Sequence, residues 1–103
     1  MSQCIAKRKL LYSLKGSSER HPFVVQVLAP RELKKGEVAF EFAEGTAVCS
    51  VEFSGLPGAS TENTYGADSL QALQLAIDVE PILKRLSKKY DLFFPTGEGY
   101  FEE

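Results

Sequence analysis

The sequence is poor in the residue types on which many protein sites depend. Its 103 residues contain no tryptophan, one methionine, one histidine and two cysteines. A structural zinc site needs about four cysteine or histidine ligands in closely spaced groups, whereas Cys4 and Cys49 are far apart in the sequence. We therefore expect two free thiols, no metal site and no cofactor.

The chain also lacks a strong charge of one sign and a long apolar run. The net charge is -2, which gives no general attraction to nucleic acids or anionic membranes. No apolar stretch approaches the roughly 18 residues that a membrane-spanning helix needs, and residues 1–9 do not have the order of regions of a signal peptide. These features predict a cytoplasmic location, with no nucleic-acid or membrane partner.

Basic residues gather in three short stretches of the chain. They lie at 7–9, 34–35 and 84–89. Because glutamates are interleaved with them in the sequence, we expect solvated strand and helix surfaces and no RNA-binding face.

The first half of the sequence has the alternating pattern of half-buried β-strands. Four segments are expected to form strands: 5–14, 23–29, 38–42 and 48–53. In the third segment, for example, Val38, Phe40 and Phe42 share one face and Glu41 lies opposite. One polar face per strand favours an antiparallel sheet that is covered on one side only.

The connections between these segments carry turn-forming residues. The sequence Ala43-Glu44-Gly45-Thr46 predicts a tight hairpin loop, because Gly45 accepts a positive φ. Residues 57–66 are small and polar, which predicts an exposed loop.

The pattern then changes to the spacing of a helix. Apolar residues recur at steps of four and three along one face: Ala72, Ala76, Val79, Leu83, Leu86 and Tyr90. Leu70, Leu73 and Ile77 add a second apolar flank, so the first half of the helix is expected to be the more deeply buried.

Pro81 interrupts this helical pattern. A proline inside a helix removes one backbone hydrogen bond. We expect either a kink at Pro81 or a break that makes it the first residue of a second helix. The tail over 92–101 is expected to form one short edge strand, or two short strands around a Pro95–Gly99 loop.

These elements predict a single α+β domain over residues 1–103. Its core is a four- to five-stranded, mainly antiparallel meander, covered on one face by a long C-terminal helix. The apolar face of that helix is expected to meet five side chains of the sheet: Val25, Val27, Phe40, Val51 and Phe53.

A short motif precedes the helix and suggests a specific chemistry. Gly66-Ala67-Asp68-Ser69-Leu70 resembles the attachment site of acyl and peptidyl carrier proteins, in which the serine carries phosphopantetheine. Carrier proteins are helical bundles, whereas strands precede this motif. We therefore interpret Asp68 as a helix N-cap and Gln71 as its capping-box partner, with phosphopantetheine at Ser69 as a remote alternative.

A second resemblance covers more of the chain. Ile5-Ala6-x-Arg8, a strand ending at Pro30, Cys49 in a strand, and the motif G-x-D-S-x-Q-A-L-x-L-A from Gly66 onward follow one another in order. This arrangement resembles a family of small uncharacterised bacterial domains. The resemblance implies a compact α+β domain from a bacterium and no assigned activity.

Catalytic residues are scarce. The single histidine, His21, precedes Pro22 in a polar turn, and no G-x-S-x-G motif is present. We therefore expect a non-catalytic domain that binds another protein, such as an adaptor or a bacterial immunity-type protein. The alternative is a small-molecule or enzymatic pocket between sheet and helix, around Tyr65, Asp68, Ser69 and His21.

Overall fold

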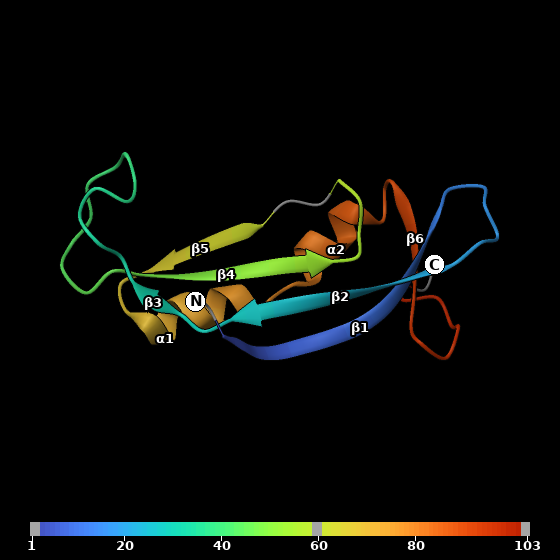
Figure 1. Ribbon diagram of the computed structural model, residues 1–103, viewed down its shortest axis with the longest axis horizontal. Helices are drawn as coiled ribbons and strands as arrows, with labels where there is room; N and C mark the ends of the chain where they lie inside the picture. Colours follow the sequence, from blue (N-terminus) through green and yellow to red (C-terminus); the bar gives the residue numbers. More distant parts are fainter. Residues whose placement is uncertain (1–2, 59–60, 102–103) are drawn as a thin grey trace.

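The computed structural model describes residues 3–58 and 61–101 and has the expected α+β architecture (Figure 1). The chain forms, in order, β1 (Cys4–Leu14), β2 (His21–Leu28), β3 (Arg31–Glu32), β4 (Ala47–Ser54), β5 (Glu62–Gly66), α1 (Ser69–Ile77), α2 (Glu80–Leu86) and β6 (Tyr90–Phe93). The α+β class predicted from the sequence is therefore confirmed.

The six strands form one antiparallel sheet. Val51 of β4 pairs with Val27 of β2 on one edge and with Glu62 of β5 on the other. The short strand β3 pairs with Ala47 and Val48, on the edge of β4 that β5 leaves free. Because β1 pairs with β2 and β6, the order across the sheet is β6–β1–β2–β4–β5. The short strand β3 shares with β2 the same edge of β4.

The core lies between the sheet and the two helices. Val25, Val51 and Leu83 are almost completely buried, and α1 lies against β4 and β5. The buried helix residues Ala72 and Ala76 are small, which lets α1 approach the sheet closely. Most of the predicted contact residues are in the core: Val25, Val27, Val51, Ala72, Ala76, Val79 and Leu83.

The predicted long helix is broken into two. The first helix ends at Ile77, the second begins at Glu80, and Pro81 lies in the first turn of the second. The amides of a first turn have no partner within the helix, so proline loses nothing there. Of the two alternatives for Pro81, the break is the one observed. No helix of the described residues has the length and apolar character needed to cross a membrane.

The predicted strand over 38–42 is wrong. This segment runs as irregular loop, and Phe40 is 50% exposed instead of meeting the helix in the core. Gly45 does adopt a positive φ of 92° in a turn, but the turn joins no such strand to β4. The reason lies in β4, whose first residues Ala47 and Val48 already pair with β3 on one edge and β5 on the other.

Two further expectations need correction. Residues 57–66 are not all loop, because Glu62–Gly66 forms β5; positions 59 and 60 lie outside the described residues. The flank of α1 is also less buried than predicted, since Leu70 is 65% and Ile77 56% exposed. The helix meets the sheet through Ala72 and Ala76, and Leu73 packs against the edge of the core, so only Leu70 and Ile77 of this flank face solvent.

The tail forms an edge strand with a short return. β6 pairs with the last residues of β1, from Leu11 to Leu14. Beyond it the chain turns back, and an isolated bridge joins Phe93 to Gly99. The predicted edge strand is present, and a single bridge takes the place of the alternative second strand.

Candidate functional site

The structure separates the four site residues predicted from the sequence. Tyr65, Asp68 and Ser69 lie around the end of β5, where Gly66 pairs with Ala47. His21 begins β2 at the other end of the sheet, where it pairs with Tyr12 (Figure 1). His21 and Ser69 therefore do not share a cleft, and a Ser–His pair is not formed.

His21 has local partners at its own end of the sheet. Its ring lies 5.4 Å from the ring of Tyr12, measured between centroids. Its Nε2 is 3.8 Å from a carboxylate oxygen of Glu19; the His21 side chain is about half exposed and that of Glu19 largely exposed. The arrangement is that of a surface histidine packed on a strand.

Asp68 caps α1, as the sequence predicts. Its Oδ1 accepts a 2.8 Å hydrogen bond from the backbone N–H of Gln71. The side chain of Gln71 reaches back and accepts a 2.6 Å hydrogen bond from the N–H of Ala67, one residue before the cap. Ser69 is the exposed first residue of the helix. The local chemistry of this motif thus serves to begin a helix.

Replacing Asp68 by alanine should lower the free energy of unfolding by about 1 kcal/mol, because the N–H of Gln71 loses its partner. Urea denaturation measures the change. Asp68→Asn keeps the acceptor oxygen and should stay close to the original protein. Equal losses in the two variants would contradict the capping role.

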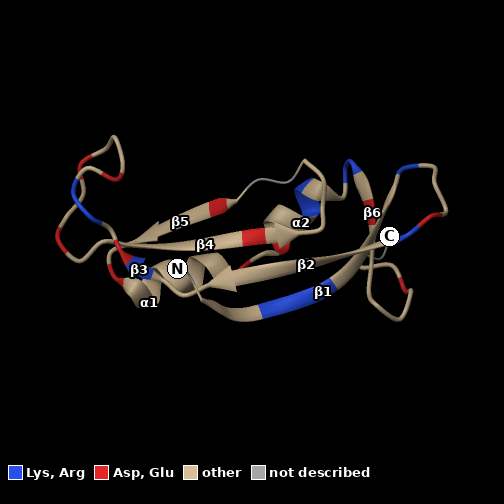
Figure 2. Ribbon diagram, in the orientation of Figure 1, with Lys and Arg blue, Asp and Glu red and all other residues tan. Residues whose placement is uncertain are grey.

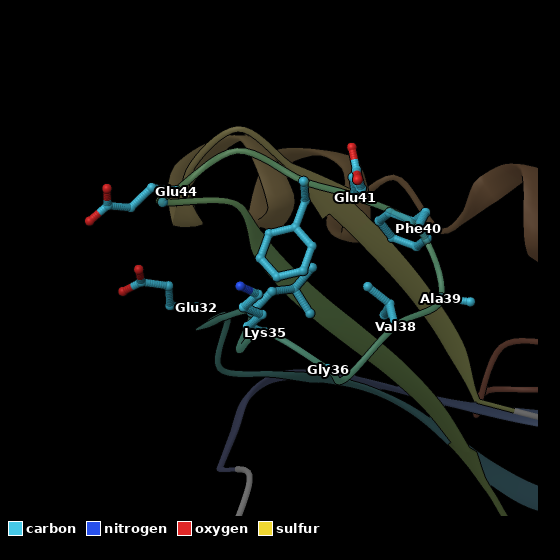
Figure 3. A pocket seen from close by; sticks show the side chains of 11 residues that line it. Glu32, Lys35, Gly36, Val38, Ala39, Phe40, Glu41 and Glu44 are labelled. Carbon is cyan, nitrogen blue, oxygen red and sulfur yellow. The ribbon is translucent and has the colours of Figure 1, made fainter.

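A hollow of about 670 Å³ lies within the loop that follows β3 (Figure 3). Its lining comes from residues 32–45 and includes Val38, Phe40 and Phe42. The carboxylates of Glu41 and Glu44 point away from it into solvent (Figure 3). None of the four predicted site residues lines this hollow, although the rings of Phe40 and Tyr65 are in contact, with centroids 5.3 Å apart.

The other notable surface is the edge of β1. β6 pairs only with Leu11–Leu14, whereas β2 pairs with β1 from Cys4 onward. Within 3–58 and 61–101, no strand pairs with the second edge of Cys4–Leu10, which we call the open edge of β1. A strand edge presents a row of backbone N–H and C=O groups that can pair with another chain.

Three consecutive basic residues occupy this open edge (Figure 2). Arg8 shares the helix-facing side of the sheet with the buried Leu10, because side chains alternate along a strand. Lys7 and Lys9 point to the opposite side and are exposed. The sequence indicated a solvated basic surface here, but it could not show that the basic surface lies on an unpaired edge.

Arg8 is held by residues from the C-terminal half of the chain. Its guanidinium donates to the carboxylate of Glu80 over 3.0 Å and to the hydroxyl of Tyr100. The Tyr100 hydroxyl also donates to Glu80. Burial raises the pKa of Tyr100, and its hydrogen bond to Glu80 raises that pKa further, so the phenol remains protonated.

Aromatic rings surround this ion pair. The ring of Tyr100 lies 4.9 Å from that of Phe94 and 5.0 Å from that of Phe101, measured between centroids. With Arg8 and Glu80 these rings line a hollow of about 410 Å³. These aromatic residues of the tail thus lie beside the open edge of β1.

Comparisons of the chain with protein-family models, with curated proteins and with solved structures found no match. The resemblance to a family of small bacterial domains accordingly stays a prediction from the sequence.

Proposed function

We propose that this protein is a non-catalytic interaction domain that binds an extended segment of a polypeptide at the open edge of β1. The observation that carries the proposal is the stretch Cys4–Leu10, whose second edge is unpaired. On its other edge, Ala6 to Leu10 pair with β2 in continuous register, and the register shifts between Cys4 and Ala6. Such an edge takes up an extended peptide by main-chain hydrogen bonding, and nearby side chains then select the sequence.

The charges on the open edge restrict which segments it accepts. Lysines on an edge strand discourage indiscriminate pairing between sheets. Opposite charges directly across a strand pair stabilise it, and like charges destabilise it. Lys7 and Lys9 therefore favour a partner strand with acidic residues at alternate positions, whose remaining side chains turn toward Arg8.

The two faces of the sheet offer a partner strand different surroundings. We take β1, β2, β4 and β5 as a meander, to which β6 adds beside β1, and the helices as covering one face of the sheet only. The side chains of Lys7 and Lys9 then lie on the uncovered face, where a partner strand meets no helix. On the covered face, the hollow beside Arg8 and Tyr100 provides a place for one apolar side chain of the partner.

A short capped peptide in which glutamate alternates with phenylalanine and valine tests this function. On titration, the amides of Cys4–Leu10 should be protected from hydrogen exchange, whereas the edge strand β5 should not change. The matched control replaces each glutamate by lysine. A single-stranded oligonucleotide of the same charge as the acidic peptide serves as a second control.

Protection at Cys4–Leu10 by the acidic peptide alone would support the proposal. An absence of protection with the acidic peptide would contradict it. Equal protection by the oligonucleotide would show that charge alone, and not strand pairing, governs binding.

A further inference from the structure

The loop segment 38–42 has the sequence of a strand without the pairing of one. Val38, Phe40 and Phe42 alternate with other residues, and Glu41 lies on the opposite side. The backbone N–H and C=O groups of 38–42 form no hydrogen bond with the backbone of any described residue. Phe40 is half exposed. Apolar residues with a strand pattern and free backbone groups are suited to pairing with an edge.

This segment cannot reach the open edge of β1 in its own chain without leaving its place. Phe40 contacts Tyr65 of β5, at the opposite edge of the sheet. The strands β2 and β4 lie between β5 and β1. Because neighbouring strands are about 4.8 Å apart, β5 and β1 are about 14 Å apart. The open edge of β1 is therefore accessible to the segment of a second copy.

We propose that the segment 38–42 of one protomer adds as a strand to the open edge of β1 in a second copy of the chain. This inference rests on the proposed function, since it names the polypeptide that the edge binds. The residues Glu41, Lys7 and Lys9 then lie on the same face of the extended sheet. The side chains of Val38, Phe40 and Phe42 turn to the other face, toward the aromatic hollow beside Arg8.

Charge selects this pairing over two others. The free edge of β5 carries Glu62, already paired with Arg85, and no basic residue, so it does not attract an acidic segment. Pairing of two β1 edges would place Lys7 and Lys9 against their own counterparts, and like charges across strands destabilise a sheet. Only the open edge of β1 combines positive charge with a free backbone and an aromatic hollow among the described strands.

Charge exchange between protomers tests the inference. We expect the protein to self-associate in sedimentation velocity, with a dissociation constant that rises about tenfold or more in Lys7→Glu/Lys9→Glu and in Glu41→Lys. A mixture of these two variants should associate again, because each then meets an edge or a segment of opposite charge. Glu98→Lys, in the exposed tail, is the control and should leave association unchanged.

Three outcomes would overturn the inference. A protein that is monomeric at every concentration, with fast hydrogen exchange of the 38–42 amides, has no such partner. A monomer whose 38–42 amides are protected pairs the segment within its own chain. Failure of the mixture to associate, with both variants folded by circular dichroism, would place the contact elsewhere. In each case, protection of Cys4–Leu10 by the acidic peptide would leave the proposed function standing.

Discussion

Replacing Leu83 by alanine should lower the free energy of unfolding by about 2–5 kcal/mol. Leu83 is completely buried in α2 and belongs to the core between helices and sheet. The substitution removes apolar atoms from contact and leaves a cavity that a packed interior fills only in part. Urea denaturation at constant temperature measures the loss through the midpoint of the transition.

Leu70→Ala is the matched control for this prediction. It deletes the same atoms from a neighbouring helix, but Leu70 is 65% exposed. Its cost should stay within about 0.5 kcal/mol, as is usual for surface positions. Similar losses in the two variants would mean that α1 and α2 pack differently from the structure. An unchanged midpoint for Leu83→Ala would contradict the core as described.

The sequence predicts the helix face correctly because its pattern is local. Ala72, Ala76, Val79 and Leu83 follow helical spacing, and all four are buried. The same spacing spans the break at residues 78–79, since both helices face the same sheet. The N-cap of Asp68 was also predictable, because it depends on residues within one turn. The exposure of Leu70 was not predictable, because the spacing of apolar residues does not show whether another element covers that side of the helix.

The strand expected over 38–42 shows where a local pattern is insufficient. Alternation describes which side chains can share a face, but a strand forms only beside an available edge. Here β3 and β5 occupy both edges of the first residues of β4. The five-residue strand β5 was missed for the converse reason. Its sequence, Glu62-Asn63-Thr64-Tyr65-Gly66, is polar, and its pairing with β4 makes it a strand.

The candidate site depends on contacts between distant parts of the chain. Arg8 meets Glu80 and Tyr100, which are 72 and 92 residues away in the sequence. The three basic residues and the tail aromatics are visible in the sequence, but their proximity follows from the pairing of β6 with β1. The sequence does not show that the pairing of β6 with β1 ends at Leu11. Because the pairing ends there, the edge of β1 before Leu11 stays open.

Replacing Gly66 by alanine should destabilise the protein by about 3 kcal/mol, the upper part of the range for overpacked positions. Gly66 ends β5 at the point where the chain passes under the start of α1. A Cβ atom added there would overlap the backbone nitrogen of Ala72 and lie 2.9 Å from the carbonyl carbon of Gln71. These are backbone atoms, so no side chain can rotate away to make room.

Gly99→Ala is the control for this effect. A Cβ atom at Gly99 would meet nothing closer than 3.7 Å, and neither Gly66 nor Gly99 has a positive φ. The two substitutions therefore add the same methyl group, but only the one at Gly66 creates a clash. The temperature of thermal unfolding should fall for Gly66→Ala alone. If both variants unfold at the temperature of the original protein, α1 does not lie as close to β5 as the structure places it. Asp68, the N-cap of α1, follows Gly66 by two residues. That result would therefore also contradict the position of the start of α1.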